Sequence, residues 1–381
     1  MFDYVIVGAG LSGCVIARLL ADNYDKKILI LERRDCIAGN LYDEKDEVGI
    51  LIQKYGPHIF HTNSDIVYDF INKYHKWTPF LLNCKVFMKG QYTPSPFNFT
   101  TIDQYYTIHD ATTLKDALLT YYPNRETVTI VELMESSETL IKDYANFLFD
   151  SDYSLYTAKQ WGISPSEIDI SVLKRVPVRI GYVDRYFSDK YQCMPQGGFT
   201  SFISSILNHR NITIKTGIDG LDNFDICENT IDFKDLNVSE GCTLVYTGAI
   251  DELFNYCYGP LPYRSLEFKY NTYNKDKFQS APVVVYPEDP EYTRITEYKQ
   301  LPVQEIYGVT TVAVEYPRPF NLNSNFERYY PTPTTKSEEL FLKYKEKANK
   351  MENLMLCGRL ADFKYYNMDQ AILRCIQLFQ K

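Results

Sequence analysis

The sequence predicts an α/β fold in which one nucleotide-binding domain is assembled from separated segments, around an inserted helical domain and an antiparallel β-sheet domain. Three patterns support this prediction. Residues 1–78 have the pattern of a strand, a glycine turn, a helix and a second strand. Residues 262–320 alternate between apolar and polar side chains, as half-buried strands do. A strand at Leu354–Cys357, followed by a helix from about Met368, supplies the piece that would complete the first domain.

The first forty residues predict a Rossmann-like dinucleotide site. The apolar run Tyr4–Val7 is typical of a buried strand, and it leads into a turn with glycine at Gly8, Gly10 and Gly13. These glycines permit a tight turn, a close approach of the backbone to a pyrophosphate, and close packing of the next helix on the strand. The helix predicted by the apolar spacing of Cys14–Leu20 would direct its positive end at the phosphates.

Glu32 supplies the acid that such a site needs. It ends the second predicted strand, Lys27–Leu31, and lies about 20 residues beyond the turn. At that position a carboxylate can accept hydrogen bonds from both ribose hydroxyls of an adenosine.

The remaining patterns divide the chain into domains. A hairpin is expected from Cys84–Met88 and Gln91–Thr93, and a helical pattern follows over Ile102–Leu148. Residues 167–192 lose periodicity, so we expect a mobile loop near 167–180. We assign 1–78, 193–260 and 340–381 to the nucleotide-binding domain, 100–165 to the helical insert, and 79–99, 166–192 and 261–339 to the antiparallel sheet and substrate domain.

Composition argues against several classes of protein. The 381 residues carry a formal net charge of −9, whereas a nucleic-acid partner would require a basic face. No apolar run approaches the roughly 18 residues of a membrane-spanning helix. The nine cysteines form no C-x-x-C pair, which indicates reduced thiols in a cytoplasmic protein. Tyrosine is abundant, with 33 residues, and we expect a minority of them to line a polar pocket.

The order of the segments favours FAD over NAD as the dinucleotide. A nicotinamide enzyme usually completes its nucleotide fold within one continuous half of the chain. Here the closing strand and helix come from the far C-terminal part, as in two-domain flavoproteins. The step Asn367-Met368 would place a helix N-terminus beside the isoalloxazine ring, where its positive charge favours an anionic reduced flavin.

Five motifs resemble those of the bacterial UDP-galactopyranose mutases. They are Tyr55-Gly-Pro-His58-Ile-Phe-His61-Thr-Asn63, Tyr156-Thr-Ala-Lys-Gln160-Trp161-Gly, Leu173-Lys-Arg175-Val-Pro-Val-Arg179, Arg294-Ile-Thr-Glu297 and Gly358-Arg359-Leu. The resemblance extends in order over essentially the whole chain. It implies a cytoplasmic homodimer whose FAD is active once an external reductant has reduced it, and which serves cell-surface polysaccharide synthesis.

The resemblance also implies the reaction, which interconverts the pyranose and furanose forms of a nucleoside diphosphate sugar. Flavin N5 attacks the anomeric carbon as the diphosphate leaves, the flavin–sugar adduct opens and recloses through a different hydroxyl, and the diphosphate returns. No net electrons move. No third ligand accompanies His58 and His61, so no metal is expected.

Site residues follow from the motif match. Arg175, which would act on a lid, and Arg294 are the expected catalytic arginines, because a planar guanidinium can bind two diphosphate oxygens. His61 is expected near the flavin, where it would tune N5 or orient the sugar. The expected substrate-binding residues are Asn83, Tyr153, Tyr156, Trp161, Arg175, Tyr186, Arg294, Tyr316 and Tyr365. The expected cofactor-binding residues are Gly8, Gly10, Leu11, Ser12, Gly13, Glu32, Gly39, Asn40, His58, Ile218, Arg359, Asn367 and Met368.

Three departures from the family pattern leave the substrate open. Asn367 stands where the family usually has aspartate, Asp152 and Tyr153 stand where paired phenylalanines bracket the uracil, and Ala38 replaces a glycine. A changed base pocket suits dTDP-fucopyranose as well as UDP-galactopyranose, with UDP-N-acetylgalactosamine a third candidate. An FAD-dependent amine oxidase and a binding protein like the GDP-dissociation inhibitors are the alternatives from other classes.

Overall fold

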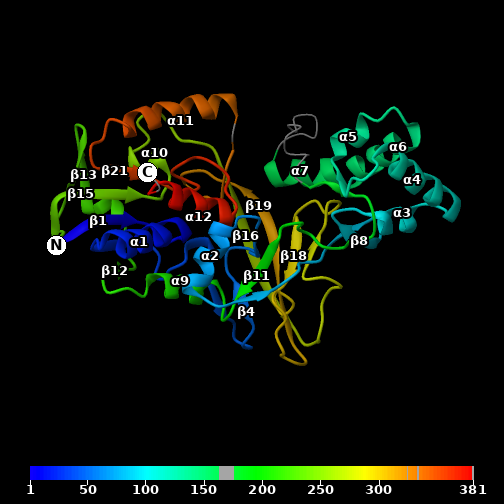
Figure 1. Ribbon diagram of the computed structural model, residues 1–381, viewed down its shortest axis with the longest axis horizontal. Helices are drawn as coiled ribbons and strands as arrows, with labels where there is room; N and C mark the ends of the chain where they lie inside the picture. Colours follow the sequence, from blue (N-terminus) through cyan, green and yellow to red (C-terminus); the bar gives the residue numbers. More distant parts are fainter. Residues whose placement is uncertain (163–175, 324, 333, 380–381) are drawn as a thin grey trace.

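The computed structural model describes residues 1–162, 176–323, 325–332 and 334–379 (Figure 1). A five-stranded parallel sheet with helices on both faces forms one end of the molecule. A helical insert forms the other end, and a seven-stranded sheet lies between the two. None of the helices within the described ranges is long and apolar enough to cross a membrane.

The parallel sheet has the strand order β12-β2-β1-β15-β21. Three separated parts of the chain supply its strands, which are β1 Phe2–Val7, β2 Ile28–Leu31, β12 Ile212–Lys215, β15 Val238–Tyr246 and β21 Leu354–Leu356. The predicted closing strand is confirmed, because β21 pairs in parallel with β15 and forms the edge of the sheet.

Both faces of this sheet are buried, which explains why its strands are continuous apolar runs. Ile6 on one face packs in a core with α1, α9 and α12. Val5 on the other face packs in a second core with α10 and α11. The bounds of these helices are α1 Leu11–Tyr24, α9 Phe199–Leu207, α10 Ile250–Leu253, α11 Thr335–Ala348 and α12 Met368–Gln377.

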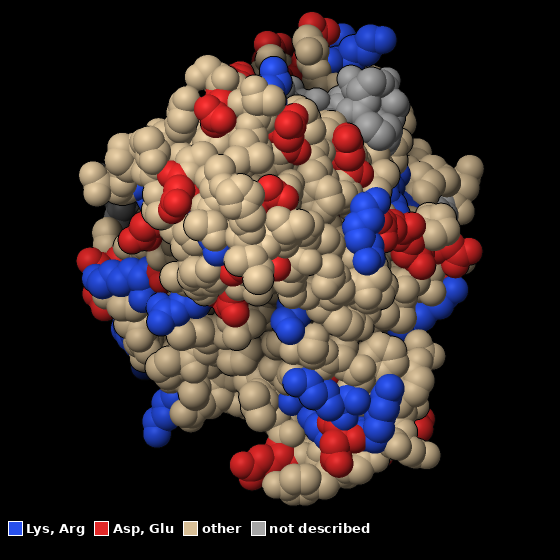
Figure 2. Space-filling view, turned by 90° about the vertical axis from the view of Figure 1, so that its right-hand side faces the viewer, with Lys and Arg blue, Asp and Glu red and all other residues tan. Residues whose placement is uncertain are grey.

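The insert has a core of its own. Its elements are α3 Phe99–Tyr105, α4 Ile108–Tyr121, β9 Thr127–Val128, α5 Ile130–Met134, α6 Thr139–Leu148, a π-helical turn at Phe149–Tyr153 and α7 Ser154–Trp161. Leu114, Leu118 and Tyr144 are fully buried in this core. On the surface of this end of the molecule, acidic and basic side chains are interspersed among uncharged ones (Figure 2).

The seven-stranded sheet has the order β20-β16-β19-β18-β17-β7-β8. Its strands are β7 Cys84–Met88, β8 Gln91–Ser95, β16 Tyr263–Tyr273, β17 Val283–Val285, β18 Arg294–Glu297, β19 Thr310–Pro319 and β20 Tyr330–Pro331. The predicted hairpin is confirmed as β7 and β8. The sheet is not purely antiparallel as predicted, since β17 runs parallel to β7.

Smaller elements connect these layers. They are β3 Asp43–Lys45, β4 Leu51–Gln53, β5 Phe60–Thr62, α2 Asp65–Tyr74, β6 Trp77–Pro79, β11 Tyr191–Pro195, β13 Phe224–Cys227 and β14 Thr230–Phe233. Strand β11 lies between β5 and β6 in an antiparallel sheet.

The predicted mobile loop lies only partly within the described structure. Residues 167–175 of it are outside the described ranges. At its end, Val178–Arg179 forms β10, which pairs with β9 of the insert and has both side chains buried. This two-residue strand is too short to show a periodicity in the sequence.

Candidate cofactor and substrate site

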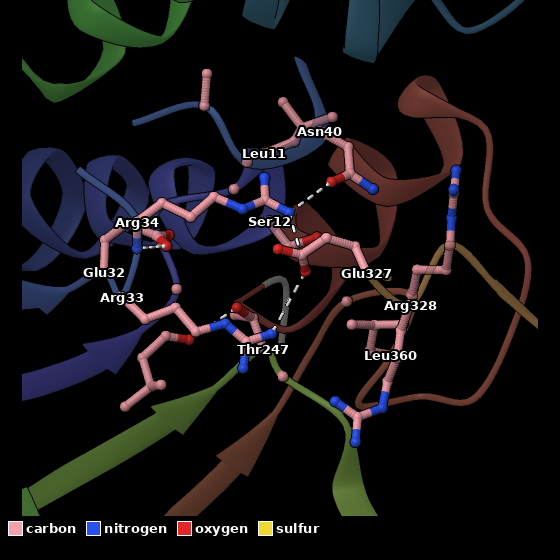
Figure 3. Close-up of a pocket in the computed structure, with 18 of the residues that line it drawn as sticks. Leu11, Ser12, Glu32, Arg33, Arg34, Asn40, Thr247, Glu327, Arg328 and Leu360 are labelled. Carbon is pink, nitrogen blue, oxygen red and sulfur yellow. Dashed lines mark hydrogen bonds and ion pairs between the residues drawn. The ribbon is translucent and has the colours of Figure 1, made fainter. Parts of the chain in front are cut away.

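A cavity of about 240 Å³ opens at the carboxyl ends of β1, β2 and β15, where α1 begins (Figure 3). This is the edge at which parallel sheets bind nucleotides. The expected cofactor-binding residues that line it are Gly8, Gly10, Leu11, Ser12, Glu32, Gly39, Asn40, His58, Arg359, Asn367 and Met368. Two others, Gly13 and Ile218, are not among its lining residues.

The glycine turn folds as tightly as the sequence predicts. Gly8 has φ +104°, and a Cβ there would lie 2.2 Å from Oγ1 of Thr247. A Cβ on Gly13 would lie 2.1 Å from the carbonyl oxygen of Gly8. Gly13 therefore supports the site through close packing of α1 on the turn rather than by facing the cavity.

Glu32 is buried, and its carboxylate is held by the backbone. Oε2 accepts a hydrogen bond from the Ala9 N–H at 2.7 Å, and Oε1 accepts one from the Arg34 N–H at 2.9 Å. Each oxygen keeps acceptor capacity for a ribose hydroxyl. Ile218 donates its own N–H to the Glu32 carbonyl at 2.9 Å, so it fixes the main chain beside the acid.

A network of charged residues that the sequence analysis missed lines the same cavity. Glu327 lies 3.3 Å from Arg34 and 3.7 Å from Arg33 (Figure 3). Glu252 lies 3.4 Å from Arg33 and 3.0 Å from Arg328. Because these residues lie far apart in the chain, no short sequence motif predicts that they meet. Arg34 Nη1 is buried and has no hydrogen-bond partner among the described residues.

These features fit a dinucleotide. The unpartnered Arg34 nitrogen and the start of α1 offer donors to an anionic diphosphate. A Cβ built on Gly10 meets no atom closer than 3.9 Å, so this residue leaves open space at the turn. Glu32 offers acceptors to a ribose.

Ala38 occupies a backbone conformation that usually belongs to glycine. It has φ +78° and is fully buried, and its N–H donates to the Ala9 carbonyl at 2.9 Å. A non-glycine residue in this region is strained. The departure at Ala38 therefore carries a conformational cost beside the cofactor cavity.

The far end of the cavity holds His58 and the start of α12. Nδ1 of His58 lies 2.8 Å from the Gly56 carbonyl, which can only accept a hydrogen bond. Burial, reinforced by the nearby Arg359 guanidinium, lowers the pKa of His58 to about 4. The ring is therefore neutral, with Nε2 unprotonated. Asn367 precedes α12, and its N–H donates to Oε1 of Gln370 at 3.0 Å.

Arg359 connects the cavity to a group of tyrosines. Its guanidinium carbon lies 4.8 Å from the ring centre of Tyr365 and 5.5 Å from that of Tyr330, and it donates to the Tyr366 carbonyl at 2.7 Å. Tyr365 is one of the expected substrate-binding residues, whereas Tyr330 was not expected in this group. Burial, with Tyr365 nearby, raises the pKa of Tyr330 to about 12.

Arg294 lies beside this group. Its Nε donates to Oε2 of the fully buried Glu315 at 2.6 Å, and Oε1 of Glu315 accepts from the Thr293 hydroxyl at 3.0 Å. Burial opposes the charge on Arg294, but Glu315 raises its pKa well above the ordinary value. Tyr156 and Tyr330 also interact electrostatically with the guanidinium, so a fixed cation faces several phenols.

Other expected substrate-binding residues lie elsewhere. Tyr316 follows Glu315 on β19, and successive strand residues face opposite sides of a sheet. Its ring lies 4.5 Å from Nζ of Lys269 and 5.3 Å from the Arg318 guanidinium, away from Arg294. Tyr316 therefore faces the side of the sheet opposite to Arg294, whereas Tyr330 interacts electrostatically with Arg294.

Tyr153 and Asn83 have structural partners. The Tyr153 hydroxyl donates to the Val176 carbonyl at 2.8 Å inside the insert core. The Asn83 backbone pairs with that of Arg185, and its side chain is exposed. Tyr186, which follows Arg185, interacts electrostatically with Tyr156. Arg175 and the side chain of Trp161 lie outside what the structure describes.

Asp152 stands where the family usually has a phenylalanine, so an ionisable side chain replaces an aromatic one. Burial raises its pKa to about 7, opposed by nearby Lys159, and its Oδ1 has no hydrogen-bond partner. His61 is not among the residues that line the cavity; its Nδ1 contacts Asp189. Within the described residues, no three His, Cys, Asp or Glu side chains gather to hold a metal ion.

Comparison with protein families gives two matches. Residues 153–365 match the UDP-galactopyranose mutase family, and residues 6–74 match the NAD(P)-binding Rossmann-like domain.

Two curated proteins align with the chain over its whole length. It is 36% identical to a dTDP-fucopyranose mutase from Escherichia coli, with 100% of this chain and 99% of that protein covered. It is also 36% identical to a UDP-galactopyranose mutase from Mycoplasma genitalium, with 100% and 94% covered.

Solved structures share the fold. A crystal structure of reduced UDP-galactopyranose mutase superposes with a TM-score of 0.72 at 17% identity, covering 99% of this chain and 93% of that one. A putative protoporphyrinogen oxidase from Exiguobacterium sp. 255-15 follows with 0.61 at 13% identity, covering 98% and 97%. The predicted fold class is confirmed.

Proposed function

Because the chain belongs to the UDP-galactopyranose mutase family, we propose that this isomerase uses FAD to interconvert the pyranose and furanose forms of a nucleoside diphosphate sugar. One observation carries the proposal. Arg359 and His58 line the dinucleotide cavity, and both lie within electrostatic reach of the cluster around Arg294 and Tyr330. We therefore treat the nucleotide cavity and the tyrosine cluster around Arg294 as two parts of one site.

The cofactor half would hold FAD through the glycine turn, Glu32 and Arg34. The diphosphate of the cofactor would meet the start of α1, and the flavin would lie toward Arg359 and the start of α12. When bound and reduced, flavin supplies an electron-rich nitrogen that can act as a nucleophile at the anomeric carbon. Asn367, which is uncharged, leaves Asp369 as the acidic residue in the first turn of α12.

The half around Arg294 would bind the sugar diphosphate. Among the described residues, Glu315 accepts a hydrogen bond from Nε of Arg294, so the two terminal nitrogens of the guanidinium can bind phosphate oxygens. A cation that is already oriented stabilises a diphosphate as it leaves and returns, without reorganising at that moment. Burial raises the pKa of Tyr156 and of Tyr330, so their phenols stay protonated and add hydrogen-bond donors. By the motif match, Arg175 would supply a second cation.

The substrate is a UDP-hexose or a dTDP-6-deoxyhexose. Both curated relatives are 36% identical to the chain, so identity does not separate a UDP-galactopyranose from a dTDP-fucopyranose substrate. Asp152, one helical turn before Tyr156, changes the side chain expected near the base but does not itself select thymine over uracil. A methyl group changes affinity in an apolar pocket by only about 1–3 kcal/mol.

The test measures ring size directly. Dithionite-reduced holoenzyme is incubated with UDP-galactofuranose and, separately, with dTDP-fucopyranose, and the nucleotide sugars are separated by chromatography. We expect conversion of at least one substrate and none with oxidised enzyme. Unchanged ring size in both incubations, or steady dye reduction by an amine, would contradict the proposal.

A further inference from the structure

A histidine–aspartate pair lies beside the site, and the sequence motifs do not predict its acidic member. Nδ1 of His61, on β5, is 3.0 Å from Oδ2 of Asp189. The His61 ring stacks on Phe187 with 3.8 Å between ring centres and 16° between the planes. Asp189 is fixed in turn, because its Oδ1 accepts a hydrogen bond from Nδ2 of Asn63 at 2.9 Å.

We propose that Asp189 is a positioning residue that fixes the tautomer of His61. A carboxylate only accepts hydrogen bonds, so the ring nitrogen that faces it carries the hydrogen. Nε2 is then the basic nitrogen of the neutral ring, and no described residue hydrogen-bonds to it. Stacking on Phe187 keeps the ring from turning over.

The surroundings of the pair lead to both halves of the site. The residue after His61, Thr62, donates its hydroxyl to Oδ2 of Asp369 at 3.0 Å, and Asp369 lies in the first turn of α12. On the other side, Phe187 meets the ring of Tyr186 edge-on, with 4.9 Å between centres. Tyr186 in turn interacts electrostatically with Tyr156, which also interacts with Arg294.

This inference rests on the proposed function, in which the ring oxygen gains a proton as one ring opens and a different hydroxyl loses a proton as the other ring closes. The imidazolium, stabilised by Asp189, gives its Nε2 proton to the ring oxygen on opening, and the neutral Nε2 takes a proton back from the hydroxyl that closes the new ring. No other group is consumed. With the opposite tautomer, Nε2 would carry hydrogen and could not accept this proton.

The first experiment observes the tautomer in the holoenzyme. Histidine ring nitrogens are labelled with ¹⁵N, and the His61 signals are assigned from a His61→Asn variant. We expect Nδ1 of His61 to be protonated in the native protein and to lose this preference in Asp189→Leu. His58 is an internal control, because its Nδ1 faces the Gly56 carbonyl and should not respond.

The second experiment measures turnover in the same variants. We expect Asp189→Leu to lower kcat by about 10²-fold, within what a positioned acid–base group contributes, with KM unchanged. Asp189→Asn keeps the shape and one acceptor, so it should retain more activity and serves if the leucine variant does not fold. The matched control is Asp65→Asn, because Asp65 holds Lys190 and Tyr191 next to Asp189 without touching His61.

A native His61 tautomer in Asp189→Leu, or wild-type turnover with the tautomer lost, would overturn the inference. If the wild-type enzyme converts neither nucleotide sugar, the proposed function fails separately, and the nitrogen spectrum alone then decides whether Asp189 fixes the ring.

Discussion

Replacing Arg294 with lysine separates the two tasks that its guanidinium performs. Nε of Arg294 is committed to Glu315 at 2.6 Å, and the other two nitrogens remain for the diphosphate. Lysine has one nitrogen on a flexible stem, so it cannot do both. Losing two hydrogen bonds to a charged group costs about 1.5–3 kcal/mol each. We therefore expect turnover to fall by about 10²–10⁴-fold.

The assay for Arg294→Lys is the chromatographic conversion of the nucleotide sugar by dithionite-reduced enzyme, with flavin absorbance as the measure of bound cofactor. The control is Arg318→Lys. Arg318 also donates hydrogen bonds to a glutamate, Glu267, at 2.6 and 2.8 Å, but it lies outside the group around Arg294. We expect that variant to stay within twofold of wild type. Turnover of Arg294→Lys within tenfold of wild type, with flavin bound, would refute the reasoning.

Three further predictions test the cofactor half. Ala38→Gly should raise the free energy of unfolding in urea by about 1 kcal/mol, because glycine relieves the strain of φ +78° at an entropic cost; an unchanged or lower value contradicts this. Gly13→Ala should yield colourless protein with weakened thermal stability, because its Cβ would lie 2.1 Å from the Gly8 carbonyl; a yellow variant with wild-type stability counts against it. Folding lowers the pKa of His58 from 6.5 to about 4. Between these two pH values the ring is protonated in the unfolded chain and neutral in the folded one. Stability should then fall as pH drops from about 6.5 toward 4, by up to roughly 3 kcal/mol; a His58→Asn variant with the same pH dependence of unfolding would contradict this.

The local parts of the fold are predictable from the sequence. The strand Cys84–Met88 and the start of the last helix at Met368 lie where their patterns predict them. The helix Thr335–Ala348 was missed, because many of its residues are charged and its buried face is narrow. Where a pattern is short or mostly polar, packing against the rest of the chain decides the structure.

The site is predictable where the functional residues lie in one contiguous motif, as in the glycine turn. It is less predictable where strand register decides which side chain points inward. Tyr316 and Tyr330 show this, because a one-residue step on β19 turns Tyr316 away from Glu315 and Arg294. Contacts such as Arg34 with Glu327 join residues almost 300 positions apart, and no local pattern reports them.

The position of β21 and α12 has a consequence for biosynthesis. Gly358, Arg359, Met368 and Ala371 line the cavity that Gly8 and Gly10 begin, so the two walls of the cavity are synthesised about 350 residues apart. A nascent chain in which only the first wall has emerged cannot enclose a dinucleotide. Cofactor loading therefore waits until β21 and α12 have been made and have packed against the rest of the sheet.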